Sequence, residues 1–71
     1  MLSELKIKII KILNSYDRPV LFKDIKDQLN ISTDALKREL NDLIKDEIIK
    51  RERGRFVLTQ KGKELVKSLE S

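Results

Sequence analysis

Residues 29–49 contain the pattern that most constrains how this chain of 71 residues can fold. Read as a helix from Ser32 to about Asp46, this stretch places apolar side chains on one stripe and polar side chains on the opposite face. The apolar stripe comprises Leu36, Leu40, Leu43 and Ile44, and the polar face comprises Asp34, Arg38, Asn41 and Lys45. Ser32 can cap the helix by accepting a hydrogen bond from a free backbone amide, and Asp34 complements the positive end of the helix dipole. The pattern therefore predicts a surface helix with one buried side.

A tight turn is expected immediately before that helix. Asn30, within the segment Leu-Asn-Ile at 29–31, is one of the few residues other than glycine that tolerate a left-handed backbone. Residues 23–29 resume a helical pattern, with Phe22, Ile25 and Leu29 on one side. The expected arrangement is a short helix, a tight turn and a capped second helix.

An amphipathic helix is also expected near the start of the chain, over about residues 3–14. Its apolar stripe comprises Leu2, Leu5, Ile9, Ile12, Leu13 and Tyr16. The segment Asp-Arg-Pro at 17–19 ends this helix, because proline lacks an amide donor and biases the preceding residue away from helical angles. Residues 20–22 are apolar and of strand-forming types, so they can supply one small strand.

A hairpin and a last helix are predicted in the C-terminal half. Two segments of branched or aromatic residues flank residues 52–55, where Gly54 can supply the positive backbone angle of a tight turn. Four of the six residues from 50 to 55 are cationic, so the hairpin has a basic tip. Thr59 is expected to cap a helix over residues 60–69. The inward-facing residues of that helix are expected to be Leu65, Val66 and Leu69. The predicted fold is a mostly helical α+β structure that forms one domain over residues 1–71.

The composition limits the chemistry that the chain can perform. It contains no cysteine and no histidine, which excludes disulfides, thiolate zinc sites and imidazole metal ligands. The only glycines are Gly54 and Gly62, so there is no glycine-rich phosphate loop. The carboxylates of Asp42, Asp46 and Glu47 cluster in sequence, but an exposed helical face explains their spacing. We therefore expect no enzyme activity, no catalytic residues, no metal and no cofactor.

The chain shows no sign of a membrane-spanning or secreted segment. Its apolar runs are short, and its charged N-terminal residues are unlike a secretory signal. These features favour a soluble, cytoplasmic protein. Eleven lysines, nine isoleucines and a single alanine suggest an AT-rich genome, and abundant lysine without cysteine would suit a hot habitat.

Positive charge is concentrated in one late segment. The net charge is +4, yet residues 48–63 alone carry +5, whereas residues 32–47 carry −2. Such asymmetry within a short chain favours a polyanionic partner, most simply nucleic acid, over a small-molecule substrate or effector. The alternative is a well-solvated charged surface, which is common in lysine-rich proteins.

Two isoleucines leave open whether the chain self-associates. Ile7 and Ile10 lie off the apolar stripe of the first helix, toward its far side. They can pack beneath the last helix, or they can form a homodimer interface. The sequence favours neither alternative.

The order helix, short strand, helix, helix, strand, strand, helix, with a basic hairpin after the third helix, resembles the winged helix-turn-helix family of DNA-binding domains. Residues 25–49 resemble the turn and recognition helix of MarR-type and ArsR-type bacterial and archaeal regulators. Residues 58–62, Leu-Thr-Gln-Lys-Gly, are similar to the Leu-Thr-x-x-Gly that follows the wing in many of them. Viruses and plasmids also carry such minimal domains. The resemblance implies a three-helix core, a two- to three-stranded wing and a C-terminal helix.

The resemblance further implies a small transcriptional regulator that binds double-stranded DNA as a homodimer and associates with the nucleoid. Its third helix, residues 32–46, would enter the major groove, and its wing, residues 50–58, would approach the backbone or the minor groove. The residues to which the resemblance assigns DNA contacts are Ser32, Thr33, Asp34, Lys37, Arg38 and Asn41 in the helix, Lys50, Arg51, Arg53 and Arg55 in the wing, and Lys61 after it.

Two departures from the family pattern bear on that role. Glu47 stands where many relatives have glycine, at the end of the recognition helix, so this turn is expected to be built differently. The recognition helix is also not basic, because its acidic residues outnumber its cations. The acidic residues are Asp34, Glu39, Asp42 and Asp46. This balance motivates an alternative function, a winged-helix protein-protein interaction module of a transcription or other assembly that does not bind DNA directly.

Overall fold

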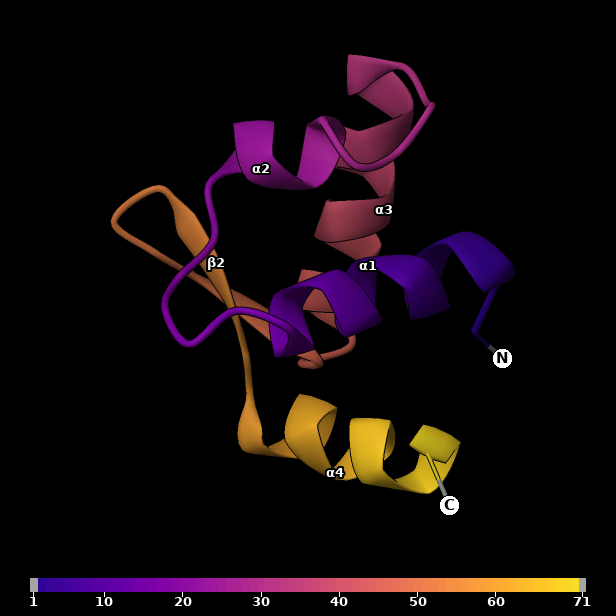
Figure 1. The fold of residues 1–71 in the computed structure, drawn as a ribbon, viewed down its shortest axis with the longest axis vertical. Helices are drawn as coiled ribbons and strands as arrows, with labels where there is room; N and C mark the ends of the chain where they lie inside the picture. Colours follow the sequence, from indigo (N-terminus) through magenta and orange to yellow (C-terminus); the bar gives the residue numbers. More distant parts are fainter. Residues whose placement is uncertain (1, 71) are drawn as a thin grey trace.

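The computed structural model describes residues 2–70, which form four helices and one antiparallel hairpin (Figure 1). In chain order the elements are α1 (Glu4–Asn14), α2 (Phe22–Lys26), α3 (Thr33–Lys45), β1 (Ile49–Glu52), β2 (Arg55–Leu58) and α4 (Gln60–Glu70). This order confirms the predicted mostly helical α+β fold, with a hairpin between the third and fourth helices.

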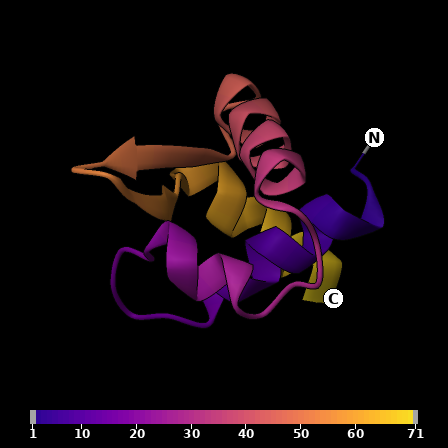
Figure 2. The same cartoon turned by 90° about the horizontal axis from the view of Figure 1, so that it is seen from above.

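All six elements contribute side chains to one core. In Figure 1, α1 lies across the centre, with α2 and α3 above it and α4 below it. Seen from above, α3 lies at the top of the view with α2 below it on the left, and the tip of the hairpin extends to the left (Figure 2). The buried residues are Ile9, Ile10, Leu13, Val20, Ile25, Leu36, Leu40, Leu43, Ile48, Ile49, Phe56 and Val66. Within residues 2–70 every buried side chain of this core is apolar, so hydrophobic burial holds the elements together.

α1 carries a wider apolar face than the sequence pattern indicated. Ile9 and Leu13 are buried, as predicted, but Ile10 is also 0% exposed within a single chain. The physical reason is that α1 is covered on more than one side, by α3 and by α4. Ile10 is therefore a core residue: of the two alternatives for it, packing within the fold is confirmed and a homodimer contact is wrong. Ile7 is half-buried.

The small strand expected before α2 consists of a single residue. The backbone amide of Val20 donates to the carbonyl of Phe56 at 2.9 Å, and the amide of Phe56 donates back to Val20 at 2.8 Å. Pairing ends there because the chain turns into α2. The Asp24 carboxylate accepts from the backbone amide of Leu21 at 3.4 Å, and the helix begins at the next residue.

α2 is also shorter than the predicted helix over residues 23–29. Beyond its end, the amide of Gln28 donates to Ile25 at 3.1 Å, and the amide of Leu29 donates to Lys26 at 3.2 Å. These bonds reach back three residues instead of four, which tightens the chain and carries it out of the α-helix.

Asn30 does not have the left-handed backbone expected there, and a left-handed residue occurs instead at the C-terminal end of α3. Asn30 is not among the described residues with positive φ, whereas Glu47 has a φ of 60°. The amide of Glu47 donates to Ile44 at 3.0 Å, and the amide of Ile48 donates to Leu43 at 3.0 Å. These two bonds form a Schellman motif, whose left-handed position is usually glycine. The turn thus has the standard hydrogen bonds but an unusual residue.

Hydrogen bonds to one carbonyl join the end of α3 to the start of α4. The Ile48 oxygen accepts from the Thr59 amide at 3.0 Å and lies 2.9 Å from Thr59 Oγ1, which also lies 2.6 Å from the Glu47 oxygen. Thr59 Oγ1 in turn accepts from the Gly62 amide at 3.0 Å, which confirms the predicted cap of α4. A Cβ at Gly62 would collide with the Ile48 oxygen. We call residues 47–48 and 59–62 the α3–α4 junction.

The inward face of α4 was predicted correctly except in its last turn. Val66 is buried and Leu65 is half-buried, but Leu69 is 37% exposed. Leu69 lies in the last turn of α4. Its predicted inward position was therefore wrong.

Substituting Glu47→Gly is expected to stabilise the fold. The left-handed conformation costs a residue with a Cβ about 1–2 kcal/mol, which exceeds the roughly 0.5–1 kcal/mol that glycine loses through its greater freedom in the unfolded chain. A gain of about 0.5–1 kcal/mol should appear in urea denaturation followed by circular dichroism. Asp46→Gly is the matched control. Asp46 has a φ of −81°, which needs no glycine, so this variant should be less stable than the wild-type protein. A lower denaturation midpoint for Glu47→Gly would contradict the expectation.

Substituting Gly62→Ala is expected to destabilise the fold. The added methyl group meets a backbone oxygen, which cannot move aside without displacing the α3–α4 junction. A loss of roughly 1–3 kcal/mol should be measured by urea denaturation, as for other overpacked sites. Lys63→Ala, at the next and exposed position, should change stability by less than about 0.5 kcal/mol. Equal midpoints for the two variants would show that the close approach at Gly62 is unimportant.

Candidate nucleic-acid interface

The N-terminal end of α3 is capped by Ser32, as predicted. Its Oγ accepts from the backbone amide of Ala35 at 3.1 Å. Thr33 and Asp34 form the first turn, and both are exposed. The positive end of the α3 dipole therefore faces solvent next to two hydroxyl groups, an arrangement suited to phosphate. Asp34 adds a negative charge at the same end.

The outward face of α3 carries cations and an amide. Lys37, Arg38, Asn41 and Lys45 are all exposed, while Leu36, Leu40 and Leu43 are buried beneath them. Within the described part of the chain, none of the three cations has a carboxylate within ion-pair distance. These side chains are therefore available to a partner.

Two of the acidic residues of α3 lie on the side that faces α1. Lys6 Nζ lies 3.4 Å from Glu39 Oε1 and 3.5 Å from Asp42 Oδ2. Partial burial lowers the pKa of Lys6, but the two carboxylates outweigh this effect and raise the pKa above its ordinary value. The net acidity of residues 32–47 therefore overstates the negative charge on the outward face of α3.

The hairpin presents different residues on its two faces. Arg51 pairs with Phe56 across the strands, and the Arg51 guanidinium lies 5.0 Å from the centre of the Phe56 ring. This distance is typical of a cation–π contact. Arg53 and Gly54 form the two-residue turn with φ values of 51° and 77°, as a type I′ hairpin requires. Arg53 is thus held at the tip and exposed.

The opposite face of the hairpin is electrostatically mixed. Successive strand residues alternate between faces, which places Lys50 and Arg55 together with Glu52. Lys50 Nζ lies 2.9 Å from Glu52 Oε1, and Arg55 stands directly across from Glu52. Lys50 and Arg55 therefore lie next to Glu52. Arg51 lies on the other face of the hairpin and Arg53 lies in the turn, so these two cations are not beside this carboxylate.

Comparison with known families decides the identity of this fold. The sequence profile of the winged helix-turn-helix family matches residues 3–71. The chain belongs to this family. Comparison with curated protein sequences gave no match. In the terms of the family, α2 and α3 are the helix-turn-helix, α3 is the recognition helix and the β1–β2 hairpin is the wing.

A groove brings the recognition helix and the wing together. It has a volume of about 240 Å³ and is lined by Phe22, Lys37, Leu40, Asn41 and Arg51. Three of these residues were assigned DNA contacts from the sequence. Phe22 and Leu40 were not, because their apolar character identifies them only as core residues. The lining of the groove thus combines two apolar side chains with one amide and two cations.

Lys61 does not join the other predicted residues. Its Nζ donates to the Asp46 carbonyl at 2.8 Å, so its charge caps the C-terminal end of α3. Such a contact is favourable because the negative end of the helix dipole lies there. The structure thus gives Lys61 a structural partner at the end of α3 opposite Ser32 and Thr33.

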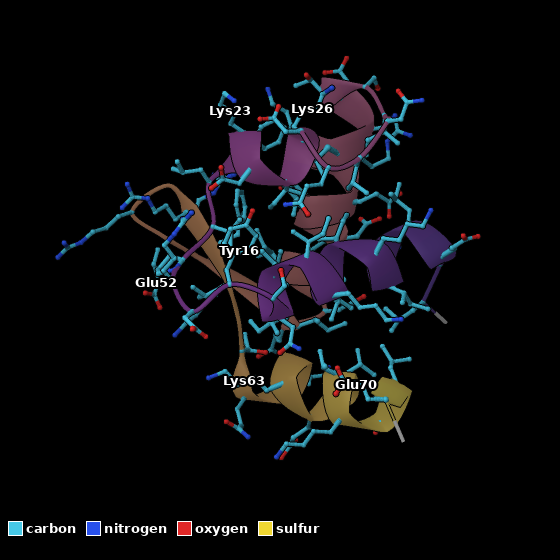
Figure 3. All side chains as sticks on the ribbon, viewed as in Figure 1. Tyr16, Lys23, Lys26, Glu52, Lys63 and Glu70 are labelled. Atoms are coloured by element: carbon cyan, nitrogen blue, oxygen red, sulfur yellow. The ribbon has the colours of Figure 1, made fainter. Side chains whose placement is uncertain are left out.

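Cations also occur outside the lining of this groove. Lys23 and Lys26 lie on α2 at one end of the molecule, and Lys63 lies on α4 toward the other end (Figure 3). Lys23 Nζ lies 2.6 Å from Asp27, and this hydrogen bond together with the charge of Asp27 raises the pKa of Lys23 above its ordinary value. Positive charge alone therefore does not define the interface.

The described residues provide no grouping of acidic side chains that could hold a metal ion. None of the helices in residues 2–70 is long and apolar enough to cross a membrane.

The cap of α3 gives a direct test of how this helix end is built. Ser32→Ala should destabilise the protein by about 1 kcal/mol, because the Ala35 amide loses its acceptor. Ser32→Asp should retain wild-type stability, because a carboxylate oxygen replaces the hydroxyl as acceptor. Thermal unfolding followed by circular dichroism would measure both effects. Equal losses in the two variants would indicate that the hydroxyl is needed for something other than the cap.

Proposed function

We propose that this winged helix-turn-helix protein binds double-stranded DNA as a small transcriptional regulator, with α3 in the major groove and the wing on the backbone or the minor groove. The observation that carries the proposal is the distribution of charge. The cations on the outward face of α3 and at the wing tip have no acidic partner within the described residues. Two carboxylates of α3 are instead paired with Lys6.

The residues of α3 divide into two kinds of contact. Ser32 and Thr33 would donate to a phosphate at the helix N-terminus. Arg38 and Asn41 would reach base edges, since arginine matches guanine and asparagine matches adenine. Each good bidentate pair contributes roughly 1–3 kcal/mol of discrimination between bases. Asp34 would accept from a cytosine amino group.

The wing supplies the second contact. Arg51 and Lys37 line the same groove, so a sugar-phosphate backbone passing between wing and helix would meet both cations. Arg53 extends from the tip, where it would reach phosphates or a narrowed minor groove. Arg55 and Lys50 would contribute on the other face of the wing, next to Glu52.

We extend the proposal to a homodimer. Two copies related by a two-fold axis would place their recognition helices on half-sites about 34–36 Å apart. Ile10 is unavailable to such a contact because it is buried, whereas Ile7 is half-buried and Leu69 is exposed. Light scattering in the binding buffers would give the mass of the particle that binds DNA.

The alternative, a protein-interaction module, has less support. It was motivated by the acidic balance of residues 32–47. Because Glu39 and Asp42 are paired with Lys6, this balance does not describe the outward surface of α3. The alternative becomes the better explanation if the purified protein fails to bind DNA at low salt.

Binding of random-sequence duplex DNA should be salt-dependent. A complex with about five phosphate contacts gives a slope of about −4 to −5 for log affinity against log salt. Replacing Arg51, Arg53 and Arg55 together by Ala should lower the affinity roughly ten- to hundredfold and make the slope shallower by about 2–3. Fluorescence anisotropy at several salt concentrations would measure both quantities.

A charge-matched variant controls for the loss of net charge. Lys8, Lys11 and Lys67 lie on α1 and α4, outside the groove, and all three are exposed. Replacing these three lysines by Ala removes the same charge and should change the affinity by less than about threefold. If both triple variants lose affinity equally, the wing is not the anchor. If the wild-type protein does not bind at low salt, the proposed function is wrong.

A further inference from the structure

Among the three lysines of α1, Lys6 is the one in contact with the recognition helix. Lys8 pairs with Glu4 of its own helix at 3.6 Å, and Lys11 is exposed. The side chain of Lys6 is 19% exposed, and that of its partner Glu39 is 21% exposed. An ion pair withdrawn from solvent to this extent is screened less by salt than a pair on the open surface.

The position of Glu39 makes Lys6 difficult to replace. Glu39 Oε1 is buried and has no hydrogen-bond partner within the described residues. The ammonium group at 3.4 Å is therefore the group that compensates its charge. Asp42, the second partner, has a side chain that is 44% exposed, so it remains close to the solvent-facing surface of α3.

The helical spacing gives Asp42 another partner if Lys6 is absent. Arg38 lies four residues before Asp42, and side chains at this spacing are neighbours on a helix surface. In the structure Asp42 instead contacts Lys6, and Arg38 has no ion pair within residues 2–70. By its spacing, Arg38 is the cation of α3 expected to pair with Asp42 when Lys6 is absent.

We infer that Lys6 is a positioning residue for DNA binding. It holds Asp42 and Glu39 on the α1 side of the recognition helix, so that Arg38 remains unpaired and its charge is available to DNA. Lys6 itself does not contact DNA. This inference rests on the proposed function, because it assigns a role to Lys6 within the same interface.

The first experiment compares Lys6→Met with Lys11→Met on random-sequence duplex DNA at low salt. Both variants lose one charge from α1. Two uncompensated carboxylates near the interface should weaken binding by Lys6→Met about three- to tenfold, whereas Lys11→Met should bind within about twofold of wild type. Lys6→Arg retains the charge and should also bind within about twofold of wild type.

Rescue separates this role from a loss of stability. The triple variant Lys6→Met, Glu39→Gln, Asp42→Asn lacks both the lysine and the carboxylates, and its affinity should return to within about twofold of wild type. Arg38→Ala should also reduce affinity less in the Lys6→Met background than in wild type, because Arg38 is then already paired with Asp42. Circular dichroism melting would fix a temperature at which all the variants are folded.

Two results would overturn the inference while leaving the proposed function intact. One is equal affinity of Lys6→Met and Lys11→Met, and the other is a triple variant that binds as weakly as Lys6→Met. A wild-type protein that fails to bind DNA at low salt would overturn both the proposed function and the inference that rests on it.

Discussion

The carbonyl group of Ile48 is the constraint on which the relative placement of helix, wing and C-terminal helix depends. It lies between the end of α3 and the start of β1, and it accepts from Thr59, which lies between β2 and α4. The two strands of the wing are thereby tied together at their base. Gly62 allows α4 to approach this carbonyl closely, because any side chain there would collide with it. The direction in which the wing leaves α3 is consequently set by backbone hydrogen bonds and by one missing side chain.

Acidic and basic side chains of the recognition helix lie on different sides of the helix. Glu39 and Asp42 face α1, where Lys6 lies within ion-pair distance of both and offsets one of their two charges, while Arg38 and Lys45 face solvent. A helix with nearly balanced charge can therefore present a positive surface. Counting charge along the sequence does not detect this separation, because the compensating lysine lies in a different helix. Net charge per segment is informative for the wing, where Arg51, Arg53 and Arg55 have only one acidic neighbour in the hairpin.

The sequence predicted those parts of the fold that depend on local chemistry. The Ser32 cap, the apolar stripe of α3, the turn at Gly54 and the Thr59 cap were all recognised, because each involves residues close together in the chain. The errors concern contacts between distant segments or the ends of elements. The pairing of Val20 with Phe56 joins residues that are about half the chain apart, and no local pattern shows that it stops after one residue.

The site was predicted less completely than the fold for the same reason. Lys37 and Arg51 were chosen separately as outward cations, but their meeting in one groove depends on the angle between α3 and the wing. The role proposed for Lys6 is indicated in the sequence only by a lysine that lies between Leu5 and Ile9, two apolar residues of the first helix. That signal does not identify the partner helix. The contact of Lys61 with the Asp46 carbonyl could not be predicted, because its acceptor is a backbone atom that no residue type reveals.

Phe56 shows why stability and recognition cannot be separated in a domain of this size. Its ring is 1% exposed and belongs to the core, and its backbone exchanges two hydrogen bonds with Val20. The same ring supports the Arg51 guanidinium at 5.0 Å. A smaller apolar residue at this position would leave a cavity in the core and would also remove the surface on which Arg51 rests. Arg51, one of the two cations that line the groove, is therefore positioned by a core residue, so a substitution of Phe56 should change the groove without replacing any residue that lines it.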